Sequence, residues 1–230
     1  PSPEEEKERT YLQMKKVAVF DLDGTLIDSL QGISLACNAA LRLSGLPEHE
    51  TEEYRTFIGN GMDKLIWRAL PAEADEKTFL QVKRDYDTIY CDVCAHGCPL
   101  FDGVAEMLEE LHRHDILTAA VSNKPHNQTR AVVQSSFGAL LDLAQGQREG
   151  VPLKPDPQGV RQVLEKLEGC CVSYTGDSEV DMETGKNGGF YTIGVTWGMK
   201  EEGLLRRTGA DAIAHTVEQL KQLILAAAQQ

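Results

Sequence analysis

Two aspartates stand two positions apart at the end of an apolar stretch of the sequence. The stretch is residues 16–20, and Asp21 and Asp23 follow it within the sequence DLDGT. Side chains at the carboxyl end of a parallel strand enter the crevice where α/β sheets bind ligands, so both carboxylates are candidates for one site. A carboxylate can attack phosphorus and form an aspartyl-phosphate, which divides a very slow hydrolysis into two easier steps.

Three later segments carry hydroxyl, amine and further carboxylate groups. Residues 122–124 (SNK) follow a second apolar run, Lys154 lies in the loop sequence KPDP, and Asp177 and Asp181 follow a third run. Clustered carboxylates repel one another unless a cation joins them, and hard oxygen ligands suit magnesium, which in turn suits a phosphate. The four segments together predict a magnesium and phosphate site.

Short apolar runs and helical patterns alternate through most of the chain. The runs that predict strands are residues 16–20, 116–121, 171–175 and 190–196, with weaker candidates at 140–143 and 211–214. Between them, apolar residues spaced three or four apart predict helices, as at residues 104–111. Strands that alternate with helices predict an α/β fold, a Rossmann-like parallel sheet covered by helices on both faces.

Residues 29–98 differ from the rest because no strand pattern occurs in them. Since connections in α/β domains are usually short, we interpret 29–98 as an all-helical cap domain inserted into a core domain of residues 14–28 and 99–230. The alternative is a run of extra helices packed on the core. The clearest apolar stripe of this segment is Phe79, Val82, Tyr86, Ile89 and Val93.

Composition and charge limit the class of protein. The 230 residues include 23 Lys+Arg and 36 Asp+Glu, a formal net charge of −13, so nucleic acid is not expected as a partner. No apolar run approaches the ~20 residues that span a bilayer. Residues 1–13 are acidic and polar, so we expect a flexible leader rather than a secretory signal. Six cysteines in such a chain predict reduced thiols and a cytoplasmic location.

The four segments, in this order, resemble the four motifs of the haloacid dehalogenase superfamily. DLDGTLIDS from Asp21 is similar to the first motif, SNK from Ser122 to the second, KPDP from Lys154 to the third and GDSEVD from Gly176 to the fourth. The resemblance extends from about residue 16 to the C-terminus. The carboxylate of Asp23 favours phosphoryl transfer, because the dehalogenases of the superfamily lack a carboxylate at this place.

The resemblance implies catalytic roles for five residues. Asp21 would be the nucleophile, and Asp23 would act first as general acid and then as general base. Ser122 and the backbone of Asn123 would bind the transferring phosphoryl group, and Lys154 would neutralise negative charge on the nucleophile and on that group.

The resemblance also implies a metal site. Mg²⁺ would bind the carboxylates of Asp21 and Asp177 and the backbone carbonyl of Asp23. Thr25, Ser178 and Asp181 would not bind the metal but would hold these groups in position. Asp181 could instead be a charge at a helix N-terminus.

A turn in the expected cap carries a narrower resemblance. Gly59-Asn60-Gly61, together with residues 98–104 and 194–198, is similar to the bacterial phosphoglycolate phosphatase group, in which such a turn faces the active site. A helix–helix turn that needs glycine for its backbone angles explains the same residues equally well. The resemblance implies a magnesium-dependent phosphatase for a small phosphorylated metabolite, with 2-phosphoglycolate as the best candidate.

Other functions remain open at this level. The substrate could be pyrophosphate, a nucleoside monophosphate or a sugar phosphate, because the geometry of the cap sets specificity. A sugar-phosphate mutase would keep the phosphoryl group, and a non-catalytic binding protein would have no need of the intact acidic and basic set. We expect a monomer or a homodimer.

Two side-chain groups have a simple alternative to a functional role. Cys91, Cys94 and Cys98, with His96 between them, could bind zinc, but a helix end with incidental thiols is the simpler interpretation. Lys64 and Arg68 could meet a substrate carboxylate, but solvated side chains at helical spacing are the simpler interpretation.

Overall fold

The computed structural model describes residues 14–96 and 98–229, which contain a six-stranded sheet. Every pair of neighbouring strands is parallel, in the order β3-β2-β1-β4-β5-β6. This sheet confirms the predicted α/β fold class. The strands are β1 (Lys15–Phe20), β2 (Ile116–Pro125), β3 (Leu143–Gln147), β4 (Gly169–Gly176), β5 (Thr192–Val195) and β6 (Ala212–Ala214).

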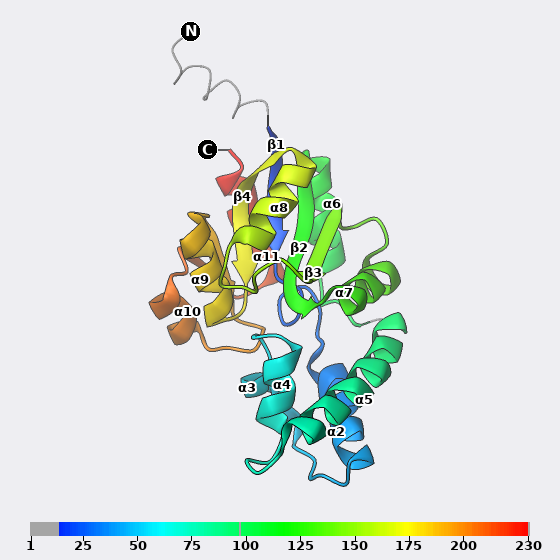
Figure 1. Ribbon diagram of the computed structural model, residues 1–230. Helices are drawn as coiled ribbons and strands as arrows, with labels where there is room; N and C mark the ends of the chain where they lie inside the picture. The colour runs from blue at the N-terminus through cyan, green and yellow to red at the C-terminus, as the bar shows by residue number, and fades with distance from the viewer. Residues whose placement is uncertain (1–13, 97, 230) are drawn as a thin grey trace.

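Helices cover both faces of the sheet (Figure 1). The central strand β1 shows why, because successive side chains of a strand point to opposite faces. Val17 and Val19 join an apolar cluster with α8, whereas Ala18 and Phe20 join the cluster that contains side chains of α6 and α11. These helices and their neighbours are α6 (Val104–Arg113), α7 (His126–Val132) with the π-helical turn η2 (Val133–Phe137), α8 (Gln158–Leu167), α9 (Glu179–Gly188), α10 (Glu202–Thr208) and α11 (Val217–Ala227).

Between β1 and β2 lies a group of helices that we call the helical segment, residues 30–95. The group sits beyond the end of the sheet toward which the strands run (Figure 1). It can therefore cover the crevice at the carboxyl ends of the strands. Its elements are α2 (Leu30–Leu43), the 3-10 turn η1 (Thr51–Glu53), α3 (Tyr54–Phe57), α4 (Met62–Ala69) and α5 (Glu76–Ala95).

The buried face of α5 differs from the predicted stripe in its last two turns. The helix begins at Asp75, whose side chain accepts a 2.8 Å hydrogen bond from the Thr78 amide. Beyond Tyr86 the buried positions are Tyr90 and Cys94, whereas the predicted Ile89 and Val93 are half-buried. A straight helix of 3.6 residues per turn shifts its inner face gradually against a repeat of seven residues, so the stripe moves by one position.

Several strand boundaries also differ from those predicted, and β2 runs on to Pro125. The stretch 140–143 marks the turn before β3, which begins only at Leu143 and runs on through polar residues. The buried Gln145 amide donates a 3.1 Å hydrogen bond to Gln162, which satisfies a polar group that apolar patterning cannot detect. Strand β5 is shorter than the predicted 190–196. The leader expected at 1–13 lies outside the described residues, and none of the described helices has the length and apolarity to cross a membrane.

Candidate active site

The carboxyl ends of the central strands and the helical segment together enclose a cleft of about 600 Å³, part of it open to solvent. Most of the predicted site residues line it, although they come from five separate parts of the chain. Those that line the cleft are Asp21, Asp23, Ser122, Asn123, Lys154, Asp177, Ser178, Gly59 and Gly61. Thr25 and Asp181 are buried behind this lining, and Asn60 does not line the cleft.

Lys154 and Asp21 form the centre of the cleft. Asp21 follows β1, and its amide continues the ladder with a 2.8 Å bond to Thr175 of β4. The Lys154 ammonium lies 2.8 Å from Asp21 Oδ1 and 2.7 Å from Asp181 Oδ1, and the Tyr174 hydroxyl donates to the same Asp181 oxygen at 3.0 Å. Burial lowers the pKa of Lys154, but Asp181 and Asp21 together raise it well above its usual value. The lysine is therefore a fixed positive charge beside Asp21.

Asp181 lies in the first turn of α9 and forms a capping box with Ser178. Its Oδ2 accepts bonds from the Ser178 hydroxyl at 2.6 Å and the Ser178 amide at 3.2 Å. Because Oδ1 is held by Lys154 and Tyr174, both oxygens are fully engaged within the protein. Asp181 and Ser178 thus anchor the lysine from behind, and the N-terminal position of Asp181 in α9 serves the same arrangement.

Asp177, directly after β4, is held by two loops. Its Oδ1 accepts a 3.1 Å bond from the Thr25 hydroxyl and its Oδ2 a 2.6 Å bond from the Met199 amide. A side chain on Gly24, which has a φ of 83°, or on Gly198 would place a Cβ 2.4 or 2.3 Å from the Asp177 carboxylate. Only glycine fits at both positions, so the loops close tightly around this carboxylate.

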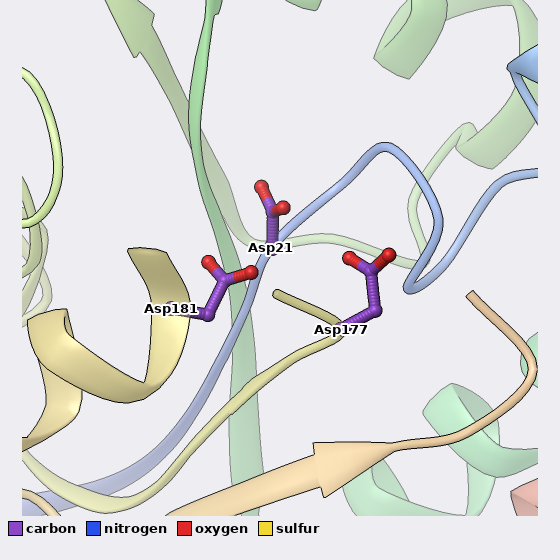
Figure 2. Close-up of side chains that lie close together, drawn as sticks. All are labelled: Asp21, Asp177 and Asp181. Atoms are coloured by element: carbon purple, nitrogen blue, oxygen red, sulfur yellow. The ribbon is translucent and has the colours of Figure 1, made fainter. Parts of the chain in front are cut away.

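The carboxylates of Asp21, Asp177 and Asp181 form a compact acidic group (Figure 2). One oxygen from each lies within 4.8 Å of the others, and this is the group among the described residues that could hold a metal ion. Burial, then repulsion by Asp181, raises the pKa of Asp21 to about 7, and the same two causes raise the pKa of Asp177 well above its usual value. A bound cation would relieve both effects.

The donor set fits a hard divalent cation. Lys154 lies near Asp21 Oδ1 but not in hydrogen-bond geometry, so this buried oxygen has no hydrogen-bond partner among the described residues. Carboxylate and carbonyl oxygens are the ligands that Mg²⁺ prefers. The side chain of Asp23 does not join the acidic group.

Asp23 instead pairs with Lys124, a residue to which the sequence motifs assigned no role. Lys124 Nζ donates a 2.6 Å hydrogen bond to Asp23 Oδ1, and both side chains are largely buried. The one sequence signal was a lysine directly after Ser122 and Asn123 at a strand end. Its partner, 101 residues away, could not be read from spacing.

Asn123 connects three segments at the edge of the cleft. Its Oδ1 accepts a 2.8 Å bond from the Lys154 amide, and its Nδ2 donates 3.2 Å bonds to the carbonyls of Lys154 and Gly59. The turn 59–61 of the helical segment is thereby tied to β2. Asn60 points elsewhere, since its Oδ1 accepts a 2.8 Å bond from Arg68.

The remaining candidates lie outside the cleft. The exposed Arg68 also donates to the Phe57 carbonyl at 2.9 Å, and Lys64 is exposed. At the end of α5 the thiols of Cys94 and Cys98 are buried, whereas Cys91 is half-buried and His96 exposed.

Comparisons with known proteins support this arrangement of elements. A family model described as haloacid dehalogenase-like hydrolase matches residues 18–195. A phosphoglycolate phosphatase of Vibrio cholerae serotype O1 is 30% identical over 222 residues, which cover 93% of this chain and 98% of that protein. Another phosphoglycolate phosphatase, from Pectobacterium atrosepticum, is 32% identical over 185 residues, covering 78% and 79%.

Solved structures share the fold. The crystal structure of a predicted phosphoglycolate phosphatase from Haemophilus somnus superimposes with a TM-score of 0.82 at 27% identity, covering 92% of this chain and 98% of that one. A crystal structure from Lactobacillus delbrueckii subsp. bulgaricus gives a TM-score of 0.85 at 26% identity, with 92% and 99% covered.

Proposed function

We propose that this enzyme, which belongs to the haloacid dehalogenase-like hydrolases, is a phosphatase that hydrolyses a small phosphomonoester through an aspartyl-phosphate on Asp21. The observation that carries the proposal is the position of Asp21 in the cleft, with the Lys154 ammonium 2.8 Å away and Asp177 in the same acidic group. The phosphoglycolate phosphatases among its relatives make 2-phosphoglycolate the leading substrate candidate.

The first step is transfer of the phosphoryl group to Asp21. A carboxylate oxygen of Asp21 attacks phosphorus, and the bond from phosphorus to the ester oxygen breaks. Asp23 donates a proton to that oxygen as it leaves. Ser122 and Asn123 line the cleft where they bind the phosphoryl oxygens, and Lys154 offsets the negative charge between Asp21 and the phosphoryl group.

The second step releases phosphate. Asp23, now ionised, takes a proton from a water molecule, whose oxygen attacks the phosphorus of the aspartyl-phosphate. The bond between phosphorus and Asp21 breaks, and both carboxylates return to their starting states. One residue therefore moves the proton in both directions, which requires its carboxylate to face the reacting atoms throughout the cycle.

Asp21, Asp177 and the Asp23 carbonyl would hold Mg²⁺, which when bound supplies positive charge that offsets the phosphoryl oxygens. Thr25 and the Met199 amide keep Asp177 oriented for this contact. Because burial and repulsion raise the pKa of the two carboxylates, the cation also favours the ionised Asp21 that the attack needs.

We further propose that residues 29–98 act as a cap domain over the core formed by 14–28 and 99–230. The bond between Asn123 and the Gly59 carbonyl supports this division, because it brings the turn of the helical segment to the phosphate-binding strand. Closure of such a cap would exclude water from the aspartyl-phosphate until Asp23 can use one molecule. The six free cysteines support a cytoplasmic location, and a monomer or homodimer remains the expected state.

The test is phosphate release from a panel that contains 2-phosphoglycolate, pyrophosphate, a nucleoside monophosphate and a sugar phosphate, with and without Mg²⁺. We expect release that needs Mg²⁺ and is abolished by Asp21→Asn, with the highest kcat/KM for 2-phosphoglycolate. Asp63→Asn, in an exposed ion pair with Lys83, is the matched control and should leave the rate unchanged. Release from no compound, or release that survives Asp21→Asn, would overturn the proposal.

A further inference from the structure

We propose that Lys124 is a positioning residue for Asp23, and that Tyr90 of α5 in turn holds Lys124. Through these two residues, the helical segment sets the orientation of the Asp23 carboxylate. This inference rests on the proposed function, because Asp23 has an orientation to keep only if it exchanges protons with substrate and water. No motif assigns either residue a role.

The ion pair between Lys124 and Asp23 is short and shielded from solvent. The distance from Nζ to Oδ1 is 2.6 Å, and the side chains are 3% and 12% exposed. Burying two charges is costly unless the geometry is good and further hydrogen bonds satisfy the remaining protons. The ion pair therefore needs additional partners for the ammonium, and one of them comes from the helical segment.

Tyr90 supplies that support from α5. Its hydroxyl accepts a 3.0 Å hydrogen bond from Lys124 Nζ, and the ammonium lies 4.6 Å from the centroid of the Tyr90 ring. The ring is fully buried and stacks on Tyr86 with centroids 5.3 Å apart. An ammonium that lies over an aromatic ring and also donates a hydrogen bond to the hydroxyl of that ring has little freedom to move. Tyr90 thus fixes where the ammonium meets Asp23.

The consequence for Asp23 is that one oxygen is anchored and the other is available. Oδ1 is held by Lys124, while Oδ2 has no hydrogen-bond partner among the described residues. The free oxygen belongs to a carboxylate that lines the cleft, where a leaving oxygen or an attacking water would exchange its proton. A misplacement of about 1 Å can lower a rate about 10²-fold, so the anchor has a measurable effect on proton transfer.

The chemistry of the leaving group separates this role from a purely structural one. An alkyl ester such as 2-phosphoglycolate expels an alkoxide that needs a proton from Asp23. Acetyl phosphate, of similar size, expels acetate, which needs none. Because kcat/KM reports the steps up to the first irreversible one, loss of a well-placed acid lowers it for the alkyl ester far more than for acetyl phosphate.

The decisive variant is Lys124→Met, which removes the ammonium and keeps an unbranched chain. We expect kcat/KM to fall about 10²-fold for 2-phosphoglycolate but less than about fivefold for acetyl phosphate. Lys83→Met, which removes a half-buried ammonium of the same helix that carries Tyr90, is the control and should change neither value. An equal loss for both substrates, or no loss, would overturn the proposal.

Tyr90→Phe tests the second half and avoids the risk that Lys124→Met unfolds the protein. It keeps the ring and loses only the hydroxyl, so we expect a loss of about three- to tenfold confined to 2-phosphoglycolate. The matched control is Tyr54→Phe, which removes a buried hydroxyl bonded to Asn38 in the same helical segment. A Tyr90→Phe enzyme with the wild-type ratio of the two kcat/KM values would exclude Tyr90 from the arrangement. Failure of the proposed function differs from both results, since the wild-type enzyme itself would then release no phosphate.

Discussion

Two buried lysines each hold an aspartate that follows β1, but different parts of the molecule hold the lysines. Lys154 is fixed by Asp181 of α9, whose same oxygen accepts a hydrogen bond from Tyr174 of β4, so the partner of Asp21 is set within the sheet and its helices. Lys124 is fixed by Tyr90, so the partner of Asp23 depends on the helical segment. The proposed nucleophile is therefore held by the core, whereas the proposed acid and base also depends on contacts from α5.

The largest effect should come from the two aspartates themselves. Asp21→Asn removes the nucleophile, and we expect at least about a 10³-fold loss of kcat for every ester. Asp23→Asn leaves the nucleophile but no base, so with acetyl phosphate the protein should accumulate one phosphoryl group on Asp21. Mass spectrometry of the acid-quenched reaction measures this adduct. If Asp23→Asn prevented formation of the adduct as fully as Asp21→Asn does, Asp21 and Asp23 would not have the separate roles proposed here.

The next effect concerns stability and compares the two lysines directly. Lys154→Met leaves two buried carboxylates, Asp21 and Asp181, without their cation, and should lower the free energy of unfolding by about 3 kcal/mol. Lys124→Met leaves only one carboxylate, Asp23, without its cation and should cost about half as much. Denaturant unfolding of both variants without metal gives the two values. If Lys124→Met lowered the free energy of unfolding more than Lys154→Met does, Lys154 would not be the more stabilising of the two lysines.

Metal and pH should change the stability of the protein through the acidic group. Burial, then Asp181, raises the pKa of Asp21 to about 7, far above its unfolded value, so the protonated form is favoured in the folded protein. The stability that this contributes is present at low pH and is lost as the pH rises through about 7, in metal-free protein. We therefore expect the free energy of unfolding of the wild-type protein to fall relative to that of Asp21→Asn between pH 5 and pH 7.5, because folding raises the pKa of Asp21.

Added Mg²⁺ should reverse this loss at pH 7.5, by about 2.7 kcal/mol at a concentration a hundred times Kd. Asp177→Asn should weaken the response, whereas Lys124→Met should keep it. Thermal melting across a Mg²⁺ titration distinguishes these results. A Mg²⁺ response unchanged by Asp177→Asn would argue against the acidic group as the metal site.

The smallest effect should come from the turn of the helical segment. Asn60 accepts its hydrogen bond from Arg68 and does not line the cleft, so Asn60→Ala should change kcat/KM by less than about twofold. Steady-state kinetics with 2-phosphoglycolate checks this. A tenfold rise in KM would instead indicate that Asn60 contacts the substrate. The helical segment would then act on the site through this turn as well as through Tyr90.

Much of the fold and of the core half of the site could be predicted without coordinates. The apolar runs located β1, β2 and β4, and polar residues directly after them could only meet at one edge of a parallel sheet. The α5 stripe was placed correctly up to Tyr86 but not beyond, since a drift of about 20° per seven residues accumulates along the helix and decides between Ile89 and Tyr90.

The kinds of groups at the site, and their gathering at one end of the sheet, follow from residue types and strand order alone. Which lysine serves which aspartate does not. Lys124 and Asp23 are 101 residues apart, and Lys124 and Tyr90 are 34 apart, so no local spacing relates them. The pairing is decided by tertiary packing. A buried ammonium is stable only where a carboxylate and other hydrogen-bond acceptors surround it, and the folded chain brings these groups together.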